Sequence, residues 1–149
     1  MSISKDNGGL IAAARALARN DLPVAEQILR PRLKASPNDV VALRLMAELA
    51  TRVGRLDHSE IMLRRALKIA PDLAAARFHL AATLYRQGRA AEALAELEPL
   101  LALNPQDTAA LKLKAAVQIR FGSADEALTI YDTMLASDPS QSDIWMSYG

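Results

Sequence analysis

The segment from Leu80 to Pro105 reads LAATLYRQGRAAEALAELEPLLALNP. The segment that begins 34 residues earlier, from Met46 to Pro71, reads MAELATRVGRLDHSEIMLRRALKIAP. Each has glycine at its ninth position and closes on proline, and small or aliphatic residues match between the two. An internal period of about 20 to 50 residues is typical of repeat proteins, in which each unit packs on its neighbours. These two segments therefore decide the class of fold.

The same period runs through the rest of the chain in four registers. One register holds proline, one holds glycine or its substitute asparagine, and two hold small residues. The members are Pro37, Pro71, Pro105 and Pro139; Asn20, Gly54, Gly88 and Gly122; Ala13, Ala47, Ala81 and Ala115; and Ala25, Ser59, Ala93 and Ala127. Such a period predicts a repeat array whose function is carried by surfaces rather than by a catalytic pocket.

Composition agrees with a helical array. Hydrophobic residues make up 51% of the 149 residues and aromatic residues only 4%, and the abundant alanine and leucine are good helix formers. The net charge of +1 gives little support to a nucleic-acid partner. No charge-free apolar run of about 18 residues is present, so we expect no membrane span. Because the chain lacks cysteine and opens without an apolar signal region, we expect a cytoplasmic protein without disulfides.

Each 34-residue unit predicts two helices. In the second unit, a first helix is expected from Asn38 to about Arg52 and a second from about Leu56 to Ile69. Gly54 between them accepts the left-handed backbone that ends a helix, and Pro71 suits the start of the next unit. The small residues at fixed registers allow two helices to cross closely. Each helix pair leaves an apolar face that only a neighbouring pair can bury.

A helix–turn–helix unit of 34 residues that ends in proline resembles the tetratricopeptide repeat. That family's pattern is Trp-x-x-Leu-Gly-x-x-Tyr, then a turn glycine, alanine, an aromatic residue, alanine and proline. The segments Met46–Pro71 and Leu80–Pro105 carry the match. The resemblance implies an all-α fold, a right-handed α-solenoid of antiparallel helix pairs in a single domain over residues 1–149. The implied repeats are approximately 6–39, 40–73, 74–107 and 108–141, with 142–149 starting a fifth.

Two prolines interrupt the pattern inside second helices, Pro31 and Pro99. An interior proline removes a backbone hydrogen bond and costs about 3 kcal/mol. We therefore expect a bend or an early break at both, with residues 28–35 and 96–103 not forming ideal helix.

The fourth unit carries polar residues where the pattern has large apolar ones. Lys114 and Gln118 are these residues, and we expect looser packing near residues 110–118.

The chain stops in mid-pattern. SDIWMSYG, from Ser142 to Gly149, matches the start of a fifth unit, so we expect a fragment of a longer protein. The alternative is a natural terminus that uses this half-unit as its cap. If the rest of the array is missing, Trp145, Met146 and Tyr148 form an exposed apolar end, and this end predicts self-association as a homodimer.

The resemblance also implies that the first helix of each pair lines a concave groove. A basic stripe with aromatic rings follows from the matching positions, since arginine binds carboxylates with two parallel hydrogen bonds and rings add stacking area. The candidates are Arg44, Glu48, Arg52, Phe78, His79, Tyr85, Arg86, Lys112 and Arg120. They predict binding of an acidic or C-terminal peptide segment. The alternative is that Arg52, Arg86 and Arg120 serve solubility and helix-end charge.

Catalysis has little support in this chain. His58 and His79 are the only histidines, and their spacing does not match a metal site. No phosphate-binding loop, dinucleotide fingerprint or nucleophile elbow is present, so we expect no catalytic residue, metal or cofactor.

Three functions remain open on the sequence. The first is a non-catalytic interaction scaffold that binds a peptide segment in its groove. The second is an N-terminal regulatory or positioning arm of a larger enzyme, such as a sulfotransferase or a glycosyltransferase. IWMSYG, from Ile144 to Gly149, resembles the repeat region ahead of the catalytic domain in bacterial sulfotransferases. The third is a self-association module that works through its exposed ends.

Overall fold

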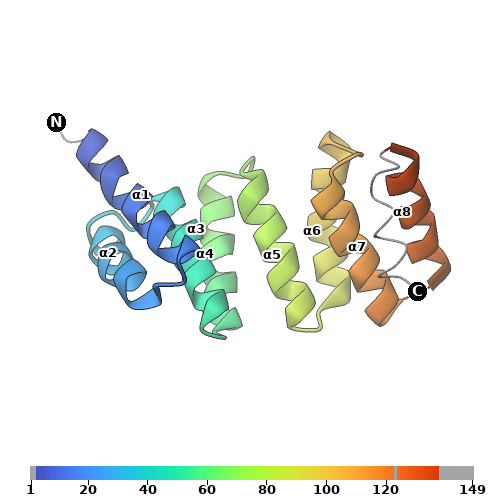
Figure 1. Cartoon of the computed structure of the whole chain (residues 1–149), viewed down its shortest axis with the longest axis horizontal. Coiled ribbons are helices and arrows are strands. Elements are labelled where there is room, and N and C mark those ends of the chain that lie inside the picture. Colours follow the sequence, from blue (N-terminus) through green and yellow to red (C-terminus); the bar gives the residue numbers. More distant parts are fainter. Residues whose placement is uncertain (1–2, 123, 138–149) are drawn as a thin grey trace. The chain divides into compact units, whose positions relative to one another are not determined.

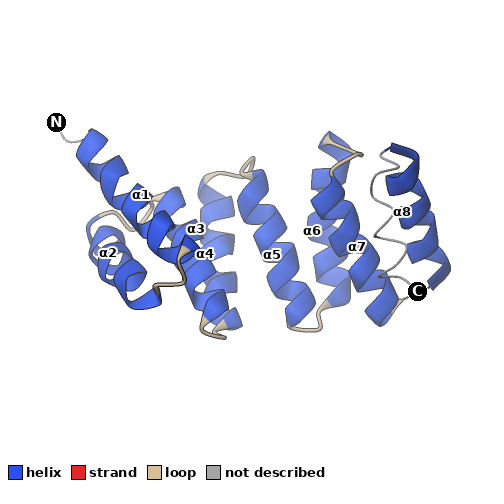
Figure 2. Cartoon of the chain, viewed as in Figure 1, coloured by secondary structure: helices blue, strands red, loops and turns tan. Residues whose placement is uncertain are grey.

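The structure is a computed structural model that describes residues 3–122 and 124–137. These residues form eight α-helices and no strand (Figure 1, Figure 2). The helices are α1 (Ile3–Ala18), α2 (Leu22–Ala35), α3 (Val40–Arg52), α4 (Leu56–Ile69), α5 (Ala74–Arg86), α6 (Ala90–Leu103), α7 (Thr108–Phe121) and α8 (Ala124–Ser137). The predicted all-α helical solenoid class is confirmed.

Two compact units divide the chain between Thr83 and Leu84, within α5. In the first unit, α1 packs on α2 and α3 packs on α4, while α3 also contacts α1 and α2 (Figure 1). In the second unit, α7 packs on α8 and contacts α6. Short turns join α1 to α2 and α3 to α4 in the first unit and α7 to α8 in the second, and each of these pairs runs antiparallel (Figure 1).

The small residues of the repeat registers lie at helix contacts, as predicted. All eight are completely buried. They are Ala13, Ala47, Ala81 and Ala115, and Ala25, Ser59, Ala93 and Ala127. Leucines complete the interior of the first unit, for example Leu17 and Leu29 against Leu45 and Leu49. In the second unit, Ala115 lies in a cluster with Tyr131 and Met134.

Helix ends follow the glycine register with one exception. Gly54, Gly88 and Asn20 have φ angles of 83°, 79° and 59°, so the left-handed conformation predicted for them is confirmed. At Gly54 the N–H donates to the carbonyl of Thr51, and the next N–H reaches back to Ala50, which satisfies carbonyls at the end of α3. Gly122 contradicts the pattern, because its φ is −135°.

Replacing Gly54 with alanine is expected to destabilise the protein by about 1 kcal/mol, because a Cβ disfavours positive φ. Open space surrounds this position, so strain of the backbone is the whole effect. Gly8→Ala is the matched control, since Gly8 lies within α1 with equally open surroundings and ordinary φ. That change should stabilise by about 0.5 kcal/mol. Urea unfolding followed by circular dichroism measures both, and the same sign for the two would contradict the argument.

The predicted breaks at the two interior prolines are wrong. Helix α2 continues through Pro31 to Ala35, and α6 continues through Pro99 to Leu103. Each proline removes one backbone hydrogen bond, but the adjoining turns are held by fully buried leucines, Leu29 in α2 and Leu97 in α6. Packing therefore overrides the local preference.

The predicted fifth half-repeat, residues 142–149, lies outside the described residues, as do Trp145, Met146 and Tyr148.

The expected absence of a membrane span concerns the helices. Within residues 3–122 and 124–137, no helix combines the length and apolar character that a membrane crossing needs.

Candidate functional site

The first unit presents three of the predicted groove residues as a ladder on one face of α3. Arg44, Glu48 and Arg52 are four residues apart, which places their side chains one above another. Arg52 Nη2 lies 2.6 Å from Glu48 Oε2, with both side chains about one third exposed. Arg52 Nη1 also donates to the backbone carbonyl of Leu17, in the last turn of α1. The charge of Arg52 is thus partly neutralised and used to cap α1.

His79 on α5 is tied into a polar cluster of the first unit. Its Nε2 lies 3.1 Å from Thr51 Oγ1, which in turn lies 2.9 Å from Ser59 Oγ and 2.9 Å from the Ala47 carbonyl. Ser59 is completely buried, whereas His79 is half-buried. The cluster joins α3, α4 and α5 by side-chain hydrogen bonds. His79 therefore has a structural role in addition to its position among the groove candidates.

This cluster was not predicted, although the sequence contains a signal for it. Ser59 is the one hydroxyl in a register that is otherwise alanine. A buried hydroxyl needs a hydrogen-bond partner, which points to a polar neighbour across the helix pair.

Phe78, the remaining groove candidate of the first unit, precedes His79 on α5 and is half-buried.

The second unit brings together an arginine and two rings. The guanidinium carbon of Arg120 lies 5.4 Å from the centre of the Tyr85 ring and 4.8 Å from that of the Phe121 ring. The two rings meet edge to face, with centroids 6.2 Å apart and planes at 83°. Tyr85 and Arg120 were predicted, but Phe121 was missed; 43% of its surface is exposed at the end of α7.

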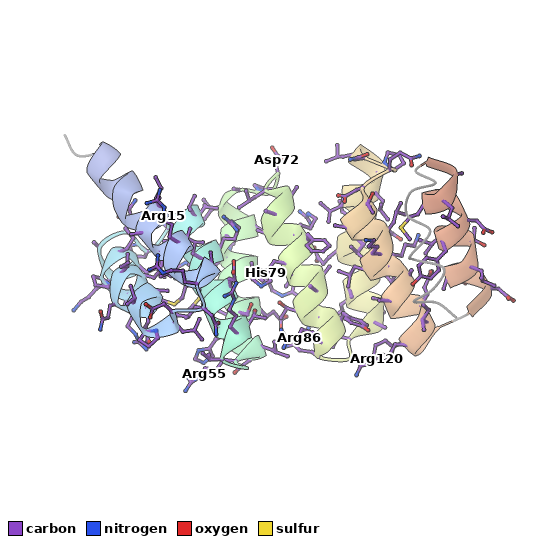
Figure 3. All side chains as sticks on the ribbon, in the orientation of Figure 1. Arg15, Arg55, Asp72, His79, Arg86 and Arg120 are labelled. Atoms are coloured by element: carbon purple, nitrogen blue, oxygen red, sulfur yellow. The ribbon has the colours of Figure 1, made fainter. Side chains whose placement is uncertain are left out.

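Three cations of the second unit are exposed, namely Arg86, Lys112 and Arg120. Arg86 and Arg120 stand at the C-terminal ends of α5 and α7 (Figure 3). Lys112 lies two turns before Arg120 on α7. Among the described residues, no carboxylate forms an ion pair with any of these three side chains. The second unit therefore presents uncompensated positive charge beside two aromatic rings.

Within residues 3–122 and 124–137, no group of three or more histidine, aspartate or glutamate side chains is arranged to hold a metal ion. His58 and His79 belong to α4 and α5.

Comparison with solved structures gives several similar folds. A crystal structure of MamA matches with a TM-score of 0.77 at 19% identity, over 90% of this chain and 73% of that one. YrrB, described as a TPR protein with an unusual peptide-binding site, matches with a TM-score of 0.74 at 21% identity, over 88% and 68%. An O-GlcNAc transferase of Thermobaculum terrenum matches at 0.74 and 22%, over 79% of this chain but 23% of the transferase. The TM-scores establish a shared fold, and at these low identities the comparison supports the fold alone.

Comparison at the sequence level identifies the family. No curated protein sequence matches the chain. The tetratricopeptide repeat profile matches residues 62–117 and 84–149, which together span more than half of the chain. This match agrees with the 34-residue period, the left-handed turn at Gly54 and the buried alanine registers. The chain therefore belongs to the tetratricopeptide repeat family.

Proposed function

We propose that the chain is a non-catalytic scaffold that binds an acidic peptide segment of a partner protein, and that the second unit supplies the main contacts. The tetratricopeptide repeat is in general a scaffold for protein–protein interaction. Tyr85, Arg86, Lys112 and Arg120 are the proposed binding residues, with Phe121 added. The first unit's candidates, Arg44, Glu48, Arg52, Phe78 and His79, would contribute less. The proposal includes a cytoplasmic location, which rests on the sequence alone.

The guanidinium of Arg120 carries this proposal. Its guanidinium carbon lies 5.4 Å and 4.8 Å from the centres of the Tyr85 and Phe121 rings, within the range of cation–π contacts, and these contacts restrain the side chain. The rings accept no conventional hydrogen bond, so the guanidinium N–H groups stay available for a planar acceptor such as a carboxylate. Arg86 and Lys112 add charge without a competing carboxylate among the described residues. In the first unit, by contrast, Glu48 already pairs with Arg52.

The double charge reversal Arg86→Glu with Arg120→Glu tests this site. Binding of a fluorescein-labelled peptide of alternating glutamate and serine, measured by anisotropy, should weaken by about tenfold or more, because attraction becomes repulsion. Arg15→Glu with Arg19→Glu is the matched control, since both residues are exposed on or beside α1 and the net charge changes equally. An equal loss of peptide affinity in the two double variants would mean that net charge alone determines binding, and this would contradict the proposed site.

A second candidate function is an arm of a larger enzyme. It is supported by the similarity to 23% of the length of an O-GlcNAc transferase, a protein in which this fold occurs together with further sequence. The sulfotransferase alternative has the sequence resemblance near Ile144 as its only support. Sequencing the native transcript past the codon for Gly149 decides the question, because a catalytic domain in the same reading frame would establish that the chain is the arm of an enzyme.

Self-association through Trp145, Met146 and Tyr148 stays a prediction. Light scattering of the Trp145→Ala variant tests it.

A further inference from the structure

The first unit contains a hollow between α2, α3 and α4 that the proposed function does not use. Its volume is about 690 Å³, which is within the range of small-ligand pockets. Apolar side chains from the three helices form most of its lining, among them Leu33, Met46, Leu49, Val53 and Met62. The exposed fraction of Val53 is 52%, so apolar surface is open to a binding partner.

The charged residues of the hollow leave one net positive charge at its rim, that of Arg55. Glu26 and Arg30 on α2 form an ion pair with each other and largely cancel. Arg55 and His58, where α4 begins, are exposed and make no side-chain ion pair among the described residues. The N-terminal end of α4 adds to the positive potential of the rim. Its first turn has no side-chain cap and therefore presents backbone N–H groups. Asp57 is also exposed on this turn but does not line the hollow.

The second unit has a hollow at the corresponding place, between α6 and α7, and its chemistry is different. Its volume is about 490 Å³, and it lies where the sequence predicted looser packing. Two repeats further along, Lys114 and Gln118 replace the Met46 and Ala50 that line the first hollow. Gln118 is buried, and its Oε1 has no hydrogen-bond partner among the described residues.

The charges at the two hollows also differ. In the repeat register, Glu98 stands for Arg30 and Lys114 for Met46, so the second hollow is lined by one acidic and one basic side chain. Glu126, which accepts a hydrogen bond of 2.9 Å from Gln118 Nε2, stands for His58 but does not line that hollow. Two copies of one repeat scaffold thus carry an apolar floor in one unit and a polar floor with mixed charge in the other. The character of the first hollow is therefore a property of its particular residues and not of the fold.

We infer that the first hollow is a second binding site, for a partner segment that inserts one large apolar side chain between flanking acidic residues. The apolar side chain would lie on Leu49, Val53 and the two methionines, whose flexible thioethers adapt to an aromatic ring. The flanking carboxylates would face Arg55 and His58. This site shares no residue with the one proposed in the second unit, so the two are separable by mutation.

A peptide series tests the site on the full chain. Fluorescein-labelled Glu-Glu-Trp-Glu-Glu is the probe, with Glu-Glu-Ala-Glu-Glu and Lys-Lys-Trp-Lys-Lys as matched peptides, and affinity is measured by anisotropy. The rim variant Arg55→Ser with His58→Glu introduces the residues that stand at these registers in the second unit. Both positions are exposed, so the fold is preserved, and binding of the tryptophan peptide should weaken about tenfold.

A second variant tests the floor of the site independently. Val53→Asp places a charge on the exposed apolar surface and should weaken the tryptophan peptide by about tenfold, because a carboxylate at the floor of the hollow would have to be buried. The rim and floor variants are also made in the Arg86→Glu, Arg120→Glu background, which removes the acidic-peptide site proposed in the second unit. Each should weaken the remaining binding of the tryptophan peptide by the same factor as before, because residues in separate sites act independently. Circular dichroism confirms that each variant is folded.

Three results would overturn the inference. Equal affinity for the tryptophan and alanine peptides would mean that charge alone attracts the probe. Unchanged affinity in both the rim and the floor variants would mean that the peptide binds elsewhere. A large loss in the Arg86 and Arg120 double variant, with none in the rim variant, would assign all binding to the second unit.

Discussion

Ala47→Leu is expected to reduce the free energy of unfolding by about 3 kcal/mol, the upper end of the range for overpacking a close helix contact. Ala47 has no exposed surface, and it lies on α3, the helix that contacts α1, α2 and α4. Three added carbon atoms have no free volume to enter, so the helices must separate or the new side chain must adopt a strained rotamer. The sequence marked this position, since alanine recurs there in all four repeats.

The control for this substitution is Ala75→Leu on α5. Ala75 is also helical but exposed, so the same change should alter stability by less than about 0.5 kcal/mol. Urea unfolding monitored at 222 nm, a wavelength at which helices absorb circularly polarised light unequally, compares the two. Similar losses at both positions would mean that leucine is disfavoured for a reason other than packing.

Asp39→Ala is expected to cost about 2 kcal/mol, because this carboxylate has two functions at once. One oxygen accepts a hydrogen bond of 3.1 Å from the N–H of Ala42 and caps the start of α3. The other lies 2.7 Å from Arg32 Nε and 2.6 Å from Arg32 Nη2, at the end of α2. The side chains of Arg32 and Asp39 are only 23% and 13% exposed, so the pair is little screened by water.

The start of α7 provides the matched control. Asp107 caps α7 through a 3.2 Å bond from the N–H of Ala110, but Leu100 stands at the register of Arg32. Asp107→Ala therefore removes a cap alone and should cost about 1 kcal/mol. Thermal unfolding of both variants, together with Arg32→Met in a double-mutant cycle, gives the share of the ion pair. Equal losses for the two aspartates would assign that pair no stabilising role.

Much of the fold was predictable because it depends on local chemistry repeated at a fixed spacing. The helix expected from about Leu56 to Ile69 has these bounds in α4, and the left-handed turns at Gly54 and Gly88 follow from glycine itself. The errors at Pro31 and Pro99 have a different origin. Whether a helix tolerates the loss of one hydrogen bond depends on how its own buried leucines, Leu29 in α2 and Leu97 in α6, pack against the rest of the fold, and local helix propensity does not report that packing.

The candidate site was predictable by register but not by partner. The sequence places Arg52, Arg86 and Arg120 at equivalent positions, yet Arg52 binds a carbonyl 35 residues away and Arg120 makes cation–π contacts with two rings. These differences depend on side-chain conformations and on contacts between distant segments. For the same reason the hollow lined by Met46 and Val53 has no signature in the repeat pattern.

The hydroxyl cluster around Thr51 limits how freely the repeats of this protein can be rearranged. Repeat proteins are often treated as modules that can be duplicated, shuffled or concatenated at unit boundaries. The second repeat contributes Thr51 and Ser59, but their imidazole partner, His79, belongs to the third, and leucine occupies that register in the second and fourth repeats. A tandem array of the second repeat alone would set these hydroxyls against leucine at every junction. The smallest transferable module of this protein is therefore the second and third repeats together.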